Sequence, residues 1–292
     1  MNYMFSFNQF KTAGLLGLLS GLIVLASYSL IGNENGLYLG LALSAMTSFS
    51  SWFFSDKVAL AAYQAQPLTE SDAPELHQLA AKLSHQAELP MPKLFIIPTQ
   101  SPNAFATGRD PNHAAVALTQ GIIDLLTTPE LEGVIAHELA HIRNKDTLTQ
   151  AVAGTLAGTI TFIGRMLSFG GLYAPASRDE QRGGNPIALV ILLVLAPLSA
   201  TLLQLGISRT REFAADETAA QITGRPVDLA NALLKLETVG QQIPMNGNPA
   251  MSPVLISNPM CAEGIQTLFR THPTTEARVE RLKSFSLTAT IA

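Results

Sequence analysis

Two histidines and a glutamate near the middle of the chain have the types and spacing of a hydrolytic metal site. His137, Glu138 and His141 form the pattern His-Glu-x-x-His. Helical residues four apart lie on the same face, so both imidazoles can bind one ion. Glu138, beside the first histidine, can reach a water at the open metal position and act as its general base. The pattern predicts one catalytic zinc ion per chain.

The residues around this motif predict that it lies on a buried helix. Thr128 is the expected N-cap, Pro129 suits the first turn, and Glu130 complements the positive end of the helix dipole. Apolar residues surround the histidines: Ile135, Ala136, Leu139, Ala140 and Ile142. Buried imidazoles need a polar partner, and a metal ion is the expected one.

A catalytic zinc usually takes three protein ligands, so one more must come from elsewhere in the chain. Glu212 and Asp216 lie four residues apart and share one face of a predicted helix. One carboxylate could bind the metal while the other accepts a hydrogen bond from a ligating histidine. The alternative is two solvated acids paired with Arg209 and Arg211. The His-Glu-x-x-His pattern upstream favours the metal site.

Composition separates this chain from ordinary soluble enzymes. Of its 292 residues, 47% are hydrophobic and only 14% are charged, and the mean hydropathy is +0.25. Such a balance predicts segments that lie in a lipid bilayer. The net charge of −4 is mild and no basic run points to nucleic acid. With one cysteine, Cys261, an internal disulfide is excluded.

Long apolar segments are expected to cross the bilayer as about four transmembrane helices, at 14–31, 37–54, 148–163 and 186–207. The second follows the first almost at once, which favours a helical hairpin over a cleaved signal peptide. Basic residues at the ends of both pairs predict that these ends face the cytoplasm. They are Lys11, Lys57, Arg143, Lys145, Arg209 and Arg211.

Three short strands are predicted ahead of the zinc helix, at 93–98, 103–107 and 113–118. A turn at 108–112 joins the last two as a hairpin. The expected fold is mainly α with a small antiparallel β-sheet, as in zincins. An edge of this sheet could accept an extended peptide as an added strand. The alternative is a structural hairpin with a covered edge. The candidate substrate-binding residues are Asn103, Ala115, Val116 and Ala117.

The order of these elements resembles the HtpX-type heat-shock membrane zinc metalloproteases, a family that also includes the CaaX prenyl endopeptidase. The similarity covers the N-terminal apolar hairpin, residues 102–108, the motif at 137–141, two further apolar segments and Arg211-Glu212-xxx-Asp216. The resemblance implies that Glu212 is the third zinc ligand. It also implies that Asp216 contacts the ligands rather than the metal.

The family also carries a His-Pro pair followed by an arginine, which His272, Pro273 and Arg278 match here. In this resemblance His272 could donate a hydrogen bond to the oxyanion of the tetrahedral intermediate. Judged by its residue type alone, His272 fits a structural role at a helix end equally well.

The expected protein is a membrane-bound zinc endopeptidase in the cytoplasmic (inner) membrane of a bacterium. Its active site would face the cytoplasm and cleave unfolded or damaged membrane proteins in stress quality control. One alternative is a prenyl-CaaX endopeptidase, which four expected spans disfavour. Another is a metal-stabilised membrane scaffold without turnover, but structural zinc sites are closed, often by cysteine.

The expected organisation interleaves membrane and catalytic parts. Residues 1–56 would form a transmembrane hairpin, and 57–147 the first part of the catalytic domain with the β-hairpin and zinc helix. Residues 148–207 would form a second transmembrane hairpin. Residues 208–292 would complete the catalytic domain with the third ligand.

Overall fold

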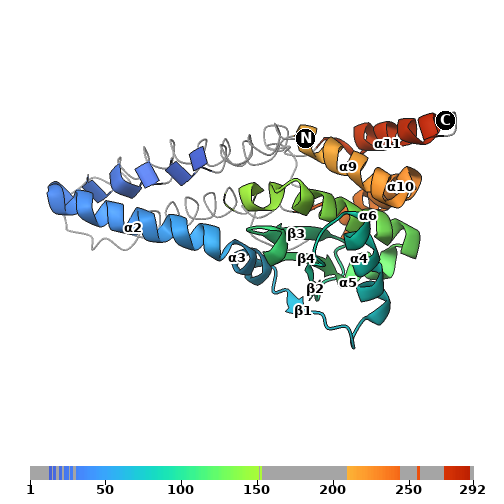
Figure 1. The fold of residues 1–292 in the computed structure, drawn as a ribbon, viewed down its shortest axis with the longest axis horizontal. Helices are drawn as coiled ribbons and strands as arrows, with labels where there is room; N and C mark the ends of the chain where they lie inside the picture. The colour runs from blue at the N-terminus through green and yellow to red at the C-terminus, as the bar shows by residue number, and fades with distance from the viewer. Residues whose placement is uncertain are drawn as a thin grey trace, which may run out of the picture.

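The computed structural model describes residues 31–150, 152, 209–243, 255–256 and 273–289, with scattered residues between 13 and 28. This part of the chain is mainly helical, as predicted, with one four-stranded sheet (Figure 1). Nearly all of the predicted segment 148–163, the whole of 186–207, Cys261 and the candidate His272 lie outside the described residues.

The predicted zinc helix is α6 (Thr128–Arg143). Figure 1 shows α6 between the sheet on one side and α9 (Arg209–Thr223) and α10 (Pro226–Gln242) on the other. Gly133 allows α10 to approach, because a Cβ there would lie 3.1 Å from the backbone of Leu229. Packing on both sides keeps the metal motif away from solvent.

Helix α6 begins one residue earlier than the sequence suggests. Its N-cap is Thr127 rather than Thr128, and the Thr127 amide donates to the Glu130 carboxylate at 2.8 Å. A capping box needs a Glu or Gln three residues after the cap. That requirement selects Thr127, because Leu131 lies three residues after Thr128.

The sheet has the strand order β1-β2-β4-β3. Its strands are β1 (Gln66–Pro67), β2 (Lys93–Ile97), β3 (Ala104–Gly108) and β4 (Ala114–Thr119). The predicted hairpin is confirmed, since β3 and β4 are antiparallel. The prediction of a wholly antiparallel sheet is wrong, because β2 and β4 run parallel and the sheet is mixed.

The second strand of the hairpin, rather than the first, lies beside β2. All six residues of β4 are buried, and its sequence Ala-Ala-Val-Ala-Leu-Thr is apolar on both faces. A nearly continuous apolar run is typical of an inner strand with neighbours on each side. With β4 in that position, β2 pairs with β4 rather than with β3, and the two strands run in the same direction.

Four further helices pack on these elements. They are α3 (Ser55–Ala62), α4 (Pro74–Gln86), α5 (Gln120–Leu125) and α11 (Thr275–Ala289). Leu83 of α4 joins Val116 of β4 and Leu139 of α6 in one hydrophobic core. On α11, Val279 and Leu282 belong to the same core. The core therefore fixes α11 in the same body as α6.

Helix α2 (Glu34–Phe53) contains most of the second predicted apolar segment and extends away from the sheet (Figure 1). It packs closely on the first segment: a Cβ at Gly40 would lie 2.8 Å from the Cα of Val24. The hydroxyls of Ser20 and Ser48 lie 3.1 Å apart. Among the described residues, no helix combines the length and apolar character needed to cross a membrane.

Candidate metal centre

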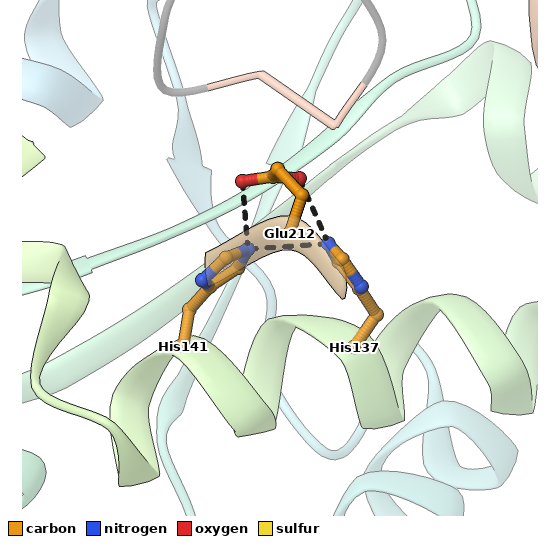
Figure 2. A group of neighbouring side chains, drawn as sticks. All are labelled: His137, His141 and Glu212. Atoms are coloured by element: carbon orange, nitrogen blue, oxygen red, sulfur yellow. Dashed lines mark hydrogen bonds and ion pairs between the residues drawn. The ribbon is translucent and has the colours of Figure 1, made fainter. Parts of the chain in front are cut away.

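Three buried side chains converge between α6 and α9. Figure 2 shows the His137 and His141 imidazoles pointing from α6 toward Glu212 on the facing helix. The two Nε2 atoms lie 3.1 Å apart, and the Glu212 oxygens lie 3.7 Å from His137 Nε2 and 3.6 Å from His141 Nε2. The structure thus brings together two helices that are far apart in the sequence, since α6 ends at Arg143 and α9 begins at Arg209.

The donor set and its spacing fit a zinc ion. Tetrahedral zinc with bonds of about 2.0–2.2 Å places neighbouring ligand atoms about 3.3–3.6 Å apart. The three separations around His137, His141 and Glu212 are close to those values. Two imidazoles and one carboxylate are also a ligand set that catalytic zinc uses, leaving a position for water. These three residues could therefore hold the metal.

Asp216 and Arg278 support the first histidine. His137 Nδ1 donates to Asp216 Oδ1 at 3.0 Å, which leaves Nε2 to face the other two candidate ligands. Nη2 and Nε of Arg278 donate to the Asp216 carboxylate at 2.7 and 2.8 Å. Burial disfavours the charged carboxylate of Asp216. The charge and hydrogen bonds of Arg278 outweigh the effect of burial and hold the pKa of Asp216 below its usual value.

The same contacts change the proton affinity of His137. Burial disfavours the charged imidazole, but hydrogen bonds to Asp216 and Glu212 outweigh burial and raise the pKa of His137 to about 9. In the metal-free protein His137 is therefore protonated at neutral pH, and a metal ion must displace that proton.

This pKa predicts proton release when zinc is added to the metal-free protein. At pH 7 we expect about one proton per zinc from His137, because the imidazole must be neutral to bind. The release should decline as the pH rises through about 9, where His137 is already neutral. Calorimetry in buffers of different ionisation enthalpy measures it. Asp216→Asn weakens the hydrogen bond that raises the pKa of His137, so this variant should release fewer protons per zinc. Equal proton release from the variant and the wild type would contradict His137 as the source of the proton.

Glu138 lies on α6 directly after the first of the two histidines. Its side chain is buried, and its carboxylate accepts a hydrogen bond from the Ala106 amide of β3. Burial raises the pKa of Glu138 above its usual value, against the opposing charges of His137 and His141. A carboxylate with a raised pKa is better matched to proton transfer near neutral pH.

The candidate substrate-binding residues do not lie on a free edge. Ala115, Val116 and Ala117 are in β4, whose residues pair with β2 on one side and β3 on the other. Asn103 precedes the edge strand β3 and is fully buried, with its side-chain oxygen accepting from the Ala104 amide at 3.0 Å.

The outward side of β3 is itself partly covered by the chain. Ala104 O accepts from the Ile256 amide at 3.0 Å, and Gly108 O accepts from the Thr147 hydroxyl at 2.9 Å. Two outward carbonyls of β3 are therefore occupied by contacts within the chain, and the addition of a substrate strand at this edge stays a prediction.

Two residues at the site had no role predicted from the sequence. Arg278 was recognised only as part of a family pattern, yet it is the buried cation that pairs with Asp216. Asp146, five residues after His141, lies 3.2 Å from His141 Nδ1. The sequence around each gives no distinctive signal, since Asp146 directly follows Arg143, Asn144 and Lys145, and Arg278 lies between Glu276 and Glu280.

Comparisons with known proteins agree with this geometry. The sequence model of Peptidase family M48 matches residues 70–286. A "Protease HtpX homolog" from Nostoc punctiforme is 54% identical over 275 residues, covering 94% of this chain and 95% of the relative. A protein of the same name from Pyrococcus furiosus is 45% identical over 278 residues, covering 95% of this chain and 96% of the relative.

The fold also has a counterpart among solved structures. The crystal structure of S. mikatae Ste24p aligns with a TM-score of 0.53 at 18% identity, covering 97% of this chain and 67% of that one. At that identity the likeness concerns the fold alone. The sequence match and the close relatives establish the activity: the chain belongs to peptidase family M48 and is a metalloprotease.

Proposed function

We propose that this metalloprotease is a zinc-dependent endopeptidase bound to the bacterial inner membrane, where it cleaves unfolded or misassembled membrane proteins under stress. The convergence of His137, His141 and Glu212 beside Glu138 carries the catalytic part of the proposal. The relatives named Protease HtpX homolog support the quality-control role.

The proposed roles follow from the contacts of each side chain. His137, His141 and Glu212 would hold zinc, which supplies a Lewis acid that polarises the scissile carbonyl and acidifies water. Glu138 takes the proton of the attacking water and returns it to the leaving amine. Asp216 fixes the tautomer of His137 through the bond to Nδ1.

The surface of α2 supports attachment to a membrane. Large apolar side chains along this helix are exposed, among them Tyr38 at 63%, Met46 at 62% and Phe49 at 58%. Exposed apolar residues in such density are unfavourable in water and favourable in lipid. We propose residues 1–56 as the N-terminal membrane part, 148–207 as the second membrane part, and a cytoplasmic active site assembled from 57–147 and 208–292.

The proposal is tested by metal analysis and proteolysis with the purified, detergent-solubilised full chain. We expect about one zinc ion per chain. We also expect degradation of an unfolded model protein that stops on removal of metal by a chelator and returns on addition of zinc. Degradation that survives complete metal removal would contradict the zinc mechanism.

A farnesylated CaaX peptide provides the second substrate in this assay. Cleavage of the unfolded protein at internal sites supports the quality-control role. Cleavage restricted to the farnesylated peptide would instead favour the prenyl-CaaX alternative, which uses the same ligands. Both substrates need the same metal, so the comparison separates substrate class from chemistry.

A further inference from the structure

The second candidate ligand, His141, also contacts a buried aspartate. His141 Nδ1 lies 3.2 Å from Asp146 Oδ2, and Asp146 is completely buried. The arrangement parallels the one at His137, where Nδ1 contacts Asp216. In both histidines Nδ1 therefore faces a carboxylate and Nε2 faces the candidate metal position.

The end of α6 brings Asp146 to this position. The helix stops at Arg143, and Lys145 adopts a left-handed conformation with φ of 56°. Non-glycine residues adopt that region only rarely. The Lys145 amide donates to Ile142 O at 3.1 Å, which closes a turn directly after the helix. A continued helix would place residue 146 on a different face from His141, since five residues turn it by about 500°.

Helix α9 supplies the charge partner of Asp146. Nη1 of Arg211 lies 3.5 Å from Asp146 Oδ1, and both side chains are buried. In the described structure, Nε and Nη2 of Arg211 have no hydrogen-bond partner. Arg211 directly precedes Glu212, so one turn of α9 contributes both a candidate metal ligand and the cation beside Asp146.

We propose that Asp146, paired with Arg211, is a positioning residue that holds the His141 ring with Nε2 toward the zinc. Asp146 accepts a hydrogen bond from Nδ1–H of His141, which selects the tautomer with a free Nε2 lone pair. Hydrogen-bond partners of ligating histidines orient the ring and increase its basicity as a ligand. The inference rests on the zinc site of the proposed function and extends it to a residue outside the ligand set.

The test measures zinc affinity in full-length metal-free protein by competition with a chromophoric chelator. We expect Asp146→Asn, which keeps an acceptor oxygen but loses the charge, to weaken zinc binding about tenfold. Asp146→Ala, which loses both, should weaken it up to about 100-fold. The matched control is Asp124→Asn, an exposed aspartate that accepts from Gln120, and its affinity should equal wild type.

The visible spectrum of the cobalt-substituted protein is the second measurement, because its absorption bands depend on the geometry of the metal ligands. A residue that only stabilised the fold would leave these bands unchanged. Both Asp146 variants should shift the cobalt bands, because the ring of His141 changes its orientation. Thermal unfolding of the metal-free variants shows whether they fold. If Asp146→Ala fails to fold, the zinc affinity and cobalt spectrum of the isosteric Asp146→Asn variant test the proposal. Zinc affinity within twofold of wild type with unchanged cobalt bands would overturn the role of Asp146. A wild-type chain that binds no zinc would overturn the proposed function itself.

Discussion

Replacing Glu138 with glutamine is expected to lower kcat/KM for peptide cleavage by about 10²–10⁴-fold while zinc content stays at the wild-type level. Glutamine has the shape of glutamate and can still accept the hydrogen bond from the Ala106 amide. It cannot take a proton from water at neutral pH. The loss should therefore appear in turnover rather than in folding or metal binding.

The control for Glu138→Gln is the same substitution at Glu132, a glutamate of α6 that forms ion pairs away from the candidate ligands. Glu132 is also buried on α6, but it pairs with Lys82 and Arg225, whose side chains are partly exposed. Ion pairs with exposed partners contribute about 0–1 kcal/mol. Glu132→Gln should therefore retain wild-type cleavage. Cleavage by purified, zinc-loaded Glu138→Gln at a rate close to that of Glu132→Gln would refute the general-base assignment.

The pairing of the two histidines on one helix could be predicted because its information is local. His137 and His141 are four residues apart on a helix whose period is fixed by the backbone, so their convergence needs no tertiary contact. The approach of Glu212 could be anticipated from ligand chemistry and from the family pattern. The structure supplies the distances that join them.

Features that depend on how elements pack were harder to predict. A hairpin signal shows that β3 and β4 pair, but it does not show which of them lies beside β2. The parallel β2–β4 pair was therefore missed. The buried alanines of β4 carry the one available signal, since an inner strand is apolar on both faces.

The charged partners of the histidines illustrate the same limit. Asp146 reaches His141 only because Lys145 adopts a left-handed turn, and residue type alone does not favour that conformation at a lysine. Arg278 reaches Asp216 from a helix 62 residues further along the chain. No periodicity connects such positions, so only the packed structure reveals the contacts.

Replacing Arg278 with methionine is expected to lower the free energy of unfolding by about 3–5 kcal/mol, since removing one partner of a buried ion pair leaves the other charge uncompensated. Arg278 is 3% exposed, and its two bonds to Asp216 are 2.7 and 2.8 Å long. The pKa of Arg278 is raised by Asp216 and Glu212 despite burial, so the guanidinium is charged.

Arg281 is the matched control, because it lies one turn further along α11 and pairs with Glu217 at 3.6 Å in an exposed setting. Arg281→Met should cost no more than about 1 kcal/mol. Urea unfolding of the detergent-solubilised, metal-free protein compares the two variants. Adding Asp216→Leu to Arg278→Met should recover part of the loss, because the unpaired carboxylate is then removed. Equal stability of the Arg278 and Arg281 variants would show that the buried pair is not what holds α11 against α9.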